Sequence, residues 1–174
     1  MCGIVGSACA PRESREWISD ATLALKHRGP DDNGWVQIDD ISLGMTRLAI
    51  VDLEGGVQPF ISLDNRYSLV FNGQIYNFRK LRTQLENLGY KFRSASDTEV
   101  ILHGYIQYGE QVVEHLEGMF AFAIWDTQEK KLFAARDRFG VKPFHYSIIN
   151  NTFLFASEIK AIHATGLLSR EANE

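Results

Sequence analysis

The sequence has little cysteine, no excess of basic residues and no long apolar run, and each absence excludes a class of protein. Its two cysteines, Cys2 and Cys9, are close together near one end, so they neither form a disulfide framework nor show the paired spacing of a zinc site. The formal net charge of -4 argues against a nucleic acid as partner. No apolar stretch approaches the roughly 20 residues that cross a bilayer, so no membrane partner is expected.

Features that would divide or export the chain are missing as well. The sequence has no internal repeat, no low-complexity tract and no linker rich in Pro, Gly or Ser. Its 174 residues are therefore expected to form one domain, residues 1–174, with a core of its own. Pro11, Arg12 and Glu13 stand where a secretory signal would continue its apolar segment. The cytoplasm is the expected compartment.

Several segments have the spacing of apolar residues that is typical of amphipathic helices. The clearest helix is expected to start after Asn77, a good N-cap, and to close at Gly89. Another is expected to start near Asp97, because Ser96 and Glu99 have the spacing of a capping box. Two further helices are expected over Ser14 to Lys26 and over Ser157 to His163.

Strand-like runs lie between these helices. The segment GMFAFAIWD is apolar at both alternating positions, which is typical of a strand buried on both faces. The last three runs are joined by connections too short for a parallel crossover, so they are expected to be antiparallel neighbours. Strands and helices together predict an α+β fold of stacked antiparallel sheets with helices outside. The expected strands are Gly3 to Ala8, Gly34 to Ile38, Ser42 to Arg47, Ser68 to Asn72, Met119 to Trp125, Lys131 to Arg136, His145 to Ile149 and Phe153 to Ala156.

The opening MCGIVG places a cysteine directly in front of an apolar run. The run is either an ordinary buried strand or a strand that presents Cys2 as a nucleophile at the end of the chain, once Met1 has been removed. Cys9, at the other end of the run, is interpreted as a small buried residue.

Three more positions have both a structural and a chemical interpretation. Asn72-Gly73 follows an apolar strand and is either a turn or a pair of hydrogen-bond donors for an oxyanion. Arg47 is either a surface residue or a guanidinium that binds a carboxylate. Asp97 either stabilises the first turn of its helix or binds an ammonium group. Each of these patterns is a weak signal when it is taken alone.

The combination of motifs is far more specific than any one of them. In order along the chain stand MCGIVG, HRGPD, TRLAIVD, GGVQP, FNGQIYN, SDTEV, GMFAFAIWD, RDRFGVKP and FASEIKA. With these motifs the chain, from Cys2 to about Ala164, resembles the class II glutamine amidotransferases, which have an N-terminal cysteine nucleophile. Within that family it is most similar to the glutaminase domain of glutamine-hydrolysing asparagine synthetases. The resemblance implies a four-layer αββα sandwich of two stacked antiparallel sheets with helices on the outer faces.

The resemblance also implies a mechanism. Met1 is removed, the thiolate of Cys2 attacks the side-chain amide of glutamine, and the free α-amine of the same residue exchanges the proton. Such an exchange is easy, because an ordinary thiol and an ordinary α-amine have pKa values of about 8.5 and about 8. The side chain of Asn72 and the N–H of Gly73 hold the oxyanion, ammonia leaves, and water hydrolyses the thioester to glutamate.

The family's pocket binds the two charged ends of glutamine. By resemblance, Arg47 binds the α-carboxylate and Asp97 the α-ammonium, while Ile50 and Val51 form a wall of the pocket. Relatives have an acidic residue where this chain has Gln74, and an amide lacks the charge assistance of a carboxylate. We therefore expect Asp97 to carry more of the recognition and glutamine to bind less tightly.

Relatives continue into a synthetase domain that uses ATP and magnesium. In this chain EGGVQP has glycines but no Ser, Lys or Thr after them to hold phosphate, so no cofactor and no metal is expected for this domain. The chain is interpreted as an N-terminal fragment of a longer synthetase, whose C-terminal domain is its partner and receives the ammonia. RDRFGVKP is expected near the face that docks that domain, and HRGPD is expected to be a structural or gating loop with His27 outside catalysis.

Other interpretations stay open. A free-standing glutaminase and a homodimer are both compatible with the sequence. Gln74 leaves open a catalytically silent glutamine-sensing or docking module of the same fold, whereas the intact Cys2 and Asn72-Gly73 argue against it. Another N-terminal-nucleophile hydrolase, such as an acylase or peptidase, is disfavoured by Arg47 and Asp97, which suit the two charges of an amino acid.

Overall fold

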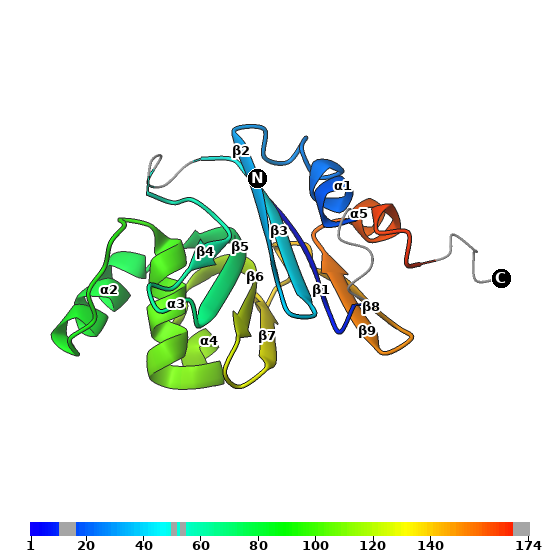
Figure 1. Ribbon diagram of the computed structural model, residues 1–174. Helices are drawn as coiled ribbons and strands as arrows, with labels where there is room; N and C mark the ends of the chain where they lie inside the picture. Colours follow the sequence, from blue (N-terminus) through cyan, green and yellow to red (C-terminus); the bar gives the residue numbers. More distant parts are fainter. Residues whose placement is uncertain (11–16, 50–51, 53–54, 169–174) are drawn as a thin grey trace. The chain divides into compact units, whose positions relative to one another are not determined.

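The structure, a computed structural model, describes residues 1–10, 17–49, 52 and 55–168. The chain forms two compact units, which we call the terminal unit (Met1–Leu48 and Pro143–Glu174) and the central unit (Ala49–Lys142). Each unit contains an antiparallel sheet with helices packed against it (Figure 1). Within the described ranges, no helix has both the length and the apolar character needed to span a membrane.

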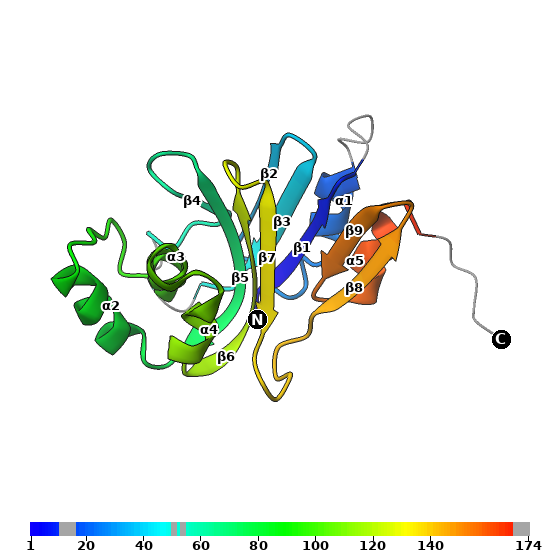
Figure 2. The ribbon, with the colours of Figure 1, turned by 90° about the horizontal axis from the view of Figure 1, so that it is seen from below.

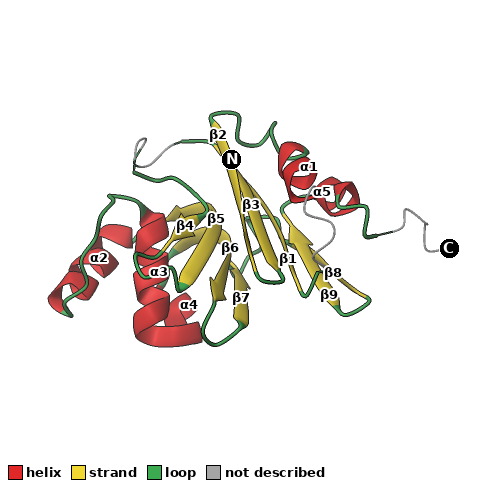
Figure 3. Ribbon diagram, in the orientation of Figure 1, coloured by secondary structure: helices red, strands yellow, loops and turns green. Residues whose placement is uncertain are grey.

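The terminal unit contains β1 (Gly3–Ala8), α1 (Trp17–Leu23), β2 (Asp32–Ile38), β3 (Ile41–Arg47), β8 (His145–Ile149), β9 (Thr152–Ala156) and α5 (Ile159–Ala164). Its strands lie in the order β2-β3-β1-β9-β8, and all neighbours are antiparallel. Helices α1 and α5 contact each other and cover one face of the sheet (Figure 3). Ile18 and Ile162 of these helices are buried with Val5 and Leu154 of the strands.

The central unit contains β4 (Phe60–Ile61), β5 (Tyr67–Ile75), α2 (Phe78–Asn87), α3 (Asp97–Tyr108), a 3₁₀ turn η1 (Gly109–Gln111), α4 (Val112–His115), β6 (Gly118–Asp126) and β7 (Lys131–Arg136). The strand order is β4-β5-β6-β7, again fully antiparallel. Helix α3 packs on one face of this sheet and α2 packs on α3 (Figure 2). Phe71 and Ile75 of β5 belong to the core that these helices close.

The expected α+β class, with antiparallel sheets and helices against them, is confirmed. The expected strands are present with small shifts at their ends, and GMFAFAIWD forms β6, most of which is buried. The expected antiparallel pairing of β8 with β9 is confirmed. The expected pairing of β7 with β8 is wrong, because β7 pairs with β6 and the connection after β7 leads into the other sheet. The short strand β4 was not expected from the sequence. The stacking of the two sheets into four layers concerns the arrangement of the two units and stays a prediction.

The helices that pack on the terminal sheet begin and end at different residues from those expected. Helix α1 ends at Leu23 rather than Lys26, because the chain tightens there and the N–H of Lys26 donates to the carbonyl of Leu23. Its expected start at Ser14 lies outside the described residues. Helix α5 starts at Ile159 rather than Ser157, because Ser157 instead exchanges two hydrogen bonds with the backbone of Ile4, at 2.8 and 3.0 Å.

Cys9 is not the small buried residue that the sequence indicated. It is exposed and has a φ of 61° at the end of β1. It therefore belongs to the turn that leaves the sheet and not to the core.

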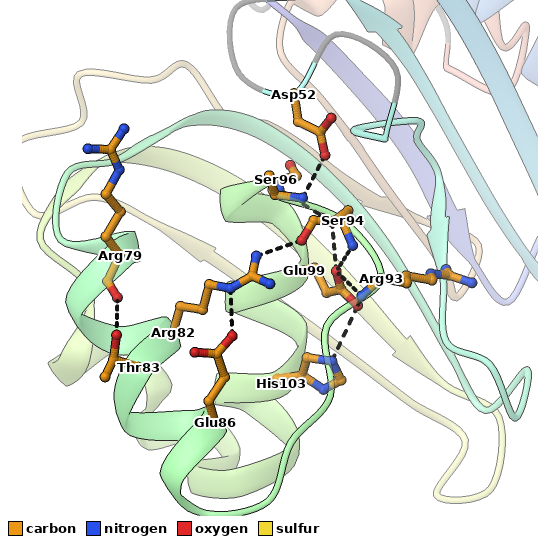
Figure 4. A network of polar contacts seen from close by, with 11 residues as sticks. Asp52, Arg79, Arg82, Thr83, Glu86, Arg93, Ser94, Ser96, Glu99 and His103 are labelled. Atoms are coloured by element: carbon orange, nitrogen blue, oxygen red, sulfur yellow. Dashed lines mark hydrogen bonds and ion pairs between the residues drawn. The ribbon is translucent and has the colours of Figure 1, made fainter.

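The start of α3 is anchored differently from a standard capping box. Ser96 accepts the N–H of Thr98 at 3.2 Å, as expected for the N-cap. Glu99, however, reaches past Ser96 and accepts the N–H groups of Arg93 and Ser94 and the hydroxyl of Ser94, at 3.0, 2.8 and 2.6 Å (Figure 4). The capping box was thus right about the helix start and wrong about the partner of Glu99.

Glu99 is a buried carboxylate whose hydrogen bonds hold it in the ionised form. Burial alone would raise its pKa, but contacts from His103, at 3.4 Å, and from Ser94 and the Arg93 backbone outweigh burial and lower the pKa to about 2. A carboxylate with a lowered pKa stabilises the fold above its unfolded pKa, and this contribution is lost as the pH falls through the folded value. The contribution of Glu99 therefore disappears between about pH 4.5 and pH 2.

We predict that Glu99→Gln lowers the free energy of unfolding at pH 7 by up to about 3 kcal/mol, because each unit of pKa shift corresponds to about 1.4 kcal/mol. The loss of stability on going from pH 5 to pH 2 should also become smaller in the variant. Urea unfolding over this pH range measures both effects. Glu86→Gln is the matched control, because among the described residues the Glu86 carboxylate contacts only Arg82, in an exposed pair at 2.9 Å, and such pairs contribute about 0–1 kcal/mol. Equal effects of the two substitutions would contradict the assignment.

Candidate active site

Cys2 lies at the entrance to β1, and the packing of that strand fixes its position. Gly3 pairs with Thr46 of β3, and a Cβ on Gly3 would come within 2.8 Å of Leu25 and of the Thr46 hydroxyl. Cys2 itself is half-buried, and its Sγ donates to the carbonyl of Leu48 at 3.7 Å. The strand interpretation and the nucleophile interpretation of MCGIVG are therefore compatible, since a buried strand presents the thiol at its end.

Arg28 is a residue of this site that the sequence interpretation missed. Its Nε donates to the carbonyl of Cys2 at 2.9 Å, and its Nη1 donates to Glu158 at 2.8 Å. The side chain is only 9% exposed, and among the described residues its Nη2 has no hydrogen-bond partner. Arg28 belongs to the motif HRGPD, for which a structural or gating function was expected, and no single position in that motif indicates a contact with Cys2.

Glu158 is the carboxylate that holds Arg28. It also contacts His27 at 2.9 Å and Lys160 at 3.2 Å. Burial would raise its pKa, but hydrogen bonds from Arg28, His27 and Lys160 outweigh burial and lower the pKa to about 2. Glu158 is therefore an anion at neutral pH, and the Arg28 guanidinium that contacts the Cys2 carbonyl is held by an ion pair.

Arg47 is the last residue of β3 and is 6% exposed. The surface interpretation of this residue is therefore wrong. The HRGPD loop packs on its backbone: Asp31 donates to the Arg47 carbonyl at 3.1 Å, and a Cβ on Gly29 would lie 2.4 Å from the Arg47 nitrogen. Ile50 and Val51, the expected wall of the pocket, lie outside the described residues.

Asn72-Gly73 is not a turn, because β5 continues through both residues to Ile75. All nine residues of β5 pair with β6, with Asn72 opposite Ala121 and Gly73 opposite Phe120. A Cβ on Gly73 would lie 2.3 Å from the carbonyl oxygen of Met119, so only glycine fits this close approach of the two strands. The turn interpretation is wrong, and the strand that was expected to end at Asn72 is longer.

The direction of the Gly73 N–H follows from the alternation of an antiparallel strand. The N–H of Tyr76, just after β5, donates to the carbonyl of Glu117, just before β6. The N–H groups of the even-numbered residues of β5 therefore point toward β6. The N–H groups of the odd-numbered residues point to the opposite edge of β5. There the N–H of Phe71 donates to the Gln58 side chain at 2.7 Å, and the N–H of Ile75 donates to Asp97 at 3.0 Å. The N–H of Gly73 lies between these two and points to the same edge.

The side chain of Asn72 is buried, and the described residues give it no hydrogen-bond partner. It is 1% exposed, and within the described ranges neither its Oδ1 nor its Nδ2 has a partner. Such a group costs free energy unless a ligand satisfies it. Asn72 and Gln74 lie on the face of the sheet opposite Phe71 and Ile75, which pack under the helices.

Asp97 is the first residue of α3 and is 5% exposed. Burial raises the pKa of its carboxyl group, while the N–H of Ile75 and other hydrogen bonds oppose this shift. Among the residues that the structure describes, no cationic side chain pairs with it. A buried carboxylate of this kind is suited to bind a cation. The half-buried Gln74 precedes the residue that Asp97 contacts.

The structure thus brings the candidate residues together in two groups. Cys2 and Arg47 lie in the terminal unit with Arg28, whereas Asn72, Gly73, Gln74 and Asp97 lie along one strand and helix end of the central unit. No group of three or more His, Cys, Asp or Glu side chains suited to hold a metal occurs in the described part of the chain. The groups offer a thiol, hydrogen-bond donors at a strand edge, a buried guanidinium and a buried carboxylate.

Comparison with known proteins relates these groups to a family. The family model described as glutamine amidotransferase domain matches residues 1–174. Asparagine synthetase [glutamine-hydrolyzing] 3 of Bacillus subtilis (strain 168) is 45% identical over an alignment of 169 residues that covers 94% of this chain and 28% of that protein. Amidase chyE of Penicillium rubens is 38% identical over an alignment of 181 residues, gaps included, that covers 96% of this chain and 27% of that protein. The chain therefore spans little more than a quarter of the length of these relatives.

A solved structure agrees with the sequence comparison. Glutamine phosphoribosylpyrophosphate amidotransferase from B. subtilis, complexed with ADP and GMP, superimposes with a TM-score of 0.81 at 26% identity, over 95% of this chain and 44% of that one. Family model, relatives and solved structure agree, and they match the family that the order of motifs indicated. The chain belongs to the glutamine amidotransferase domain family.

Proposed function

We propose that this chain is a glutaminase domain, which hydrolyses the side-chain amide of glutamine to glutamate and ammonia. The observation that carries the proposal is the pair of oxyanion donors on β5. Among the described residues the buried Asn72 side chain has no hydrogen-bond partner, and the Gly73 N–H points to the edge of β5 that faces away from β6. Family membership supports the reaction class, and the thiol of Cys2 at the end of β1 supports a covalent route.

The reaction begins with removal of Met1, which frees the α-amine of Cys2. The thiol proton passes to this amine, and the sulfur forms a bond to the amide carbon of glutamine. Asn72 and Gly73 stabilise the oxyanion, and they act most strongly on the charge that develops in the transition state. The leaving nitrogen takes the proton and departs as ammonia. Water then attacks the thioester, which gives glutamate and returns the thiol.

Two buried charged groups suit the α-carboxylate and α-ammonium of the substrate. Arg47 is a guanidinium, which binds carboxylates with two parallel hydrogen bonds, and the buried Asp97 carboxylate binds the ammonium group. The resemblance to the family implies that Ile50 and Val51, which lie outside the described residues, form a wall of the substrate pocket. Gln74 contributes an amide oxygen in place of a charge.

The recipient of the ammonia is proposed to be a further domain of a longer protein, because the matched relatives are more than three times as long as the chain. The synthetase relatives suggest a synthetase-like domain, and ATP and magnesium belong to that domain in the proposal. The turn after β7 supports docking: Asp137 closes it by accepting the N–H groups of Val141 and Lys142, both at 2.9 Å. It leaves Phe139 94% exposed.

We predict that Cys2→Ala lowers the rate of glutamate release from glutamine by about a thousandfold or more, because the covalent route is lost. Cys9→Ala is the matched control, since it removes the exposed thiol just after β1, at the opposite end of the strand from Cys2. An intact mass of the active protein should lack Met1. Glutamate release by Cys2→Ala at the wild-type rate would exclude the mechanism, and full activity with Met1 retained would exclude the role of the α-amine. A silent sensing module would bind glutamine without releasing glutamate.

We predict that Asn72→Ala lowers kcat by about a hundredfold or more, with a smaller change in KM, because an oxyanion donor acts mainly in the transition state. Ser68→Ala is the control: Ser68 lies on the same face of β5, and among the described side chains its hydroxyl is also buried without a partner. Steady-state kinetics of both variants distinguishes the two sites. A loss of kcat in Ser68→Ala as large as that in Asn72→Ala would show a general effect of the strand.

We predict that Gln74→Glu lowers the KM for glutamine by roughly fivefold, because a charged acceptor about doubles the strength of a hydrogen bond to ammonium. kcat should change little. Gln84→Glu, on the exposed face of α2, gives the same change in net charge away from the site. An unchanged KM in Gln74→Glu would place Gln74 outside the ammonium pocket.

A further inference from the structure

We propose that Gln58 is a positioning residue for glutamine hydrolysis, which ties the strand of the oxyanion donors to the helix of the ammonium-binding carboxylate. The inference rests on the proposed function. Gln58 is 6% exposed. Its Oε1 accepts the N–H of Phe71 at 2.7 Å, and its Nε2 donates to the hydroxyl of Thr98 at 3.3 Å. Phe71 immediately precedes Asn72, and Thr98 immediately follows Asp97.

Gln58 replaces a missing strand at the edge of β5. Strand β4 pairs with β5 only at Phe60 opposite Leu69 and Ile61 opposite Ser68. Beyond that point no strand covers this edge in the described part of the chain, and the buried N–H of Phe71 would lack an acceptor. The side-chain oxygen of Gln58 supplies the acceptor, so that β5 stays extended up to Asn72.

The same bond fixes the Gly73 N–H from one side. Phe71, Gly73 and Ile75 present their N–H groups to the same edge. The first is held by Gln58 and the third by Asp97. The middle N–H is therefore aimed at the edge by anchors on both sides, which keeps the oxyanion donor ready before the substrate arrives.

The bond to Thr98 gives Gln58 a second effect. It connects the start of α3, where Asp97 lies, to the strand that carries Asn72 and Gly73. Glutamine joins its ammonium group to its reacting amide through a short aliphatic chain, so the two protein elements must keep a matching separation. An error of about 1 Å in such positioning lowers rates by as much as a hundredfold.

The test compares three variants in the glutamate-release assay. Gln58→Met keeps the length of the side chain but removes both hydrogen bonds, and we expect kcat to fall by about tenfold to a hundredfold and KM to rise. Thr98→Val removes only the bond to the helix, and we expect a severalfold rise in KM with kcat within about twofold of the wild type. Ser62→Ala is the matched control, because the Ser62 hydroxyl accepts the N–H of Tyr67 at 2.9 Å on the same edge of β5, far from Asn72.

A spectroscopic measurement separates positioning from stability. In ¹H–¹⁵N spectra, Gln58→Met should move the amide resonance of Gly73, whereas Ser62→Ala should leave it in place. Wild-type kcat, KM and Gly73 resonance in folded Gln58→Met would overturn the proposal, as would an equal loss of kcat in Ser62→Ala. If Gln58→Met does not fold, Thr98→Val decides: a raised KM with kcat retained supports the tether, and an unchanged KM overturns it. A wild-type protein that releases no glutamate would refute the proposed function, while the Gly73 resonance would still test the tether.

Discussion

The organisation of the central unit depends on one constraint, the alternation of N–H groups along β5. A strand paired on one side must satisfy every second N–H from the other side, or leave it for a ligand. Strand β4 is too short to cover this edge beyond Leu69. Side chains from two distant places, Gln58 and Asp97, satisfy the N–H groups on either side of Gly73. An uncovered strand edge can pair with another strand. Here the bonds to Gln58 and Asp97 instead orient the N–H of Gly73, which lies between them.

The terminal unit uses close packing for a similar purpose. There is no room for a Cβ on Gly3 beside Thr46 and Leu25. This close packing fixes the start of β1 against β3, and therefore also the position of the preceding residue, Cys2. The Cys2 carbonyl is then held by Arg28, which is itself held by the ionised Glu158. Burial works against the charge of Glu158, yet three cationic or hydrogen-bonding partners outweigh it. The position of Cys2 is thus set mainly by contacts of the backbone around it.

Much of the fold was predictable from the sequence because its signals are local. The N-cap Ser96 and the continuous apolar run of β6 act over a few residues, and both were assigned correctly. The contacts that were missed join residues far apart in the chain: Arg28 and Cys2 are 26 positions apart, and Gln58 and Phe71 are 13 apart. The Asn72-Gly73 pair was ambiguous for the same reason, because the choice between turn and strand depends on the close approach of Met119.

The free-energy cost of burying the Asn72 amide supports its proposed role as an oxyanion donor more strongly than its sequence motif does. A buried polar group without a partner costs about 1–3 kcal/mol, against a total stability of about 5–15 kcal/mol for a typical domain. Buried hydroxyls such as that of Ser68 also lack partners in the described residues, but a hydroxyl can rotate, whereas an amide must satisfy two fixed ends. Asn72 is the only side-chain amide in the described part of the chain with both ends buried and unpartnered. Such a group is retained when a ligand oxygen restores the lost hydrogen bond, which is what the oxyanion of an amide under attack would do.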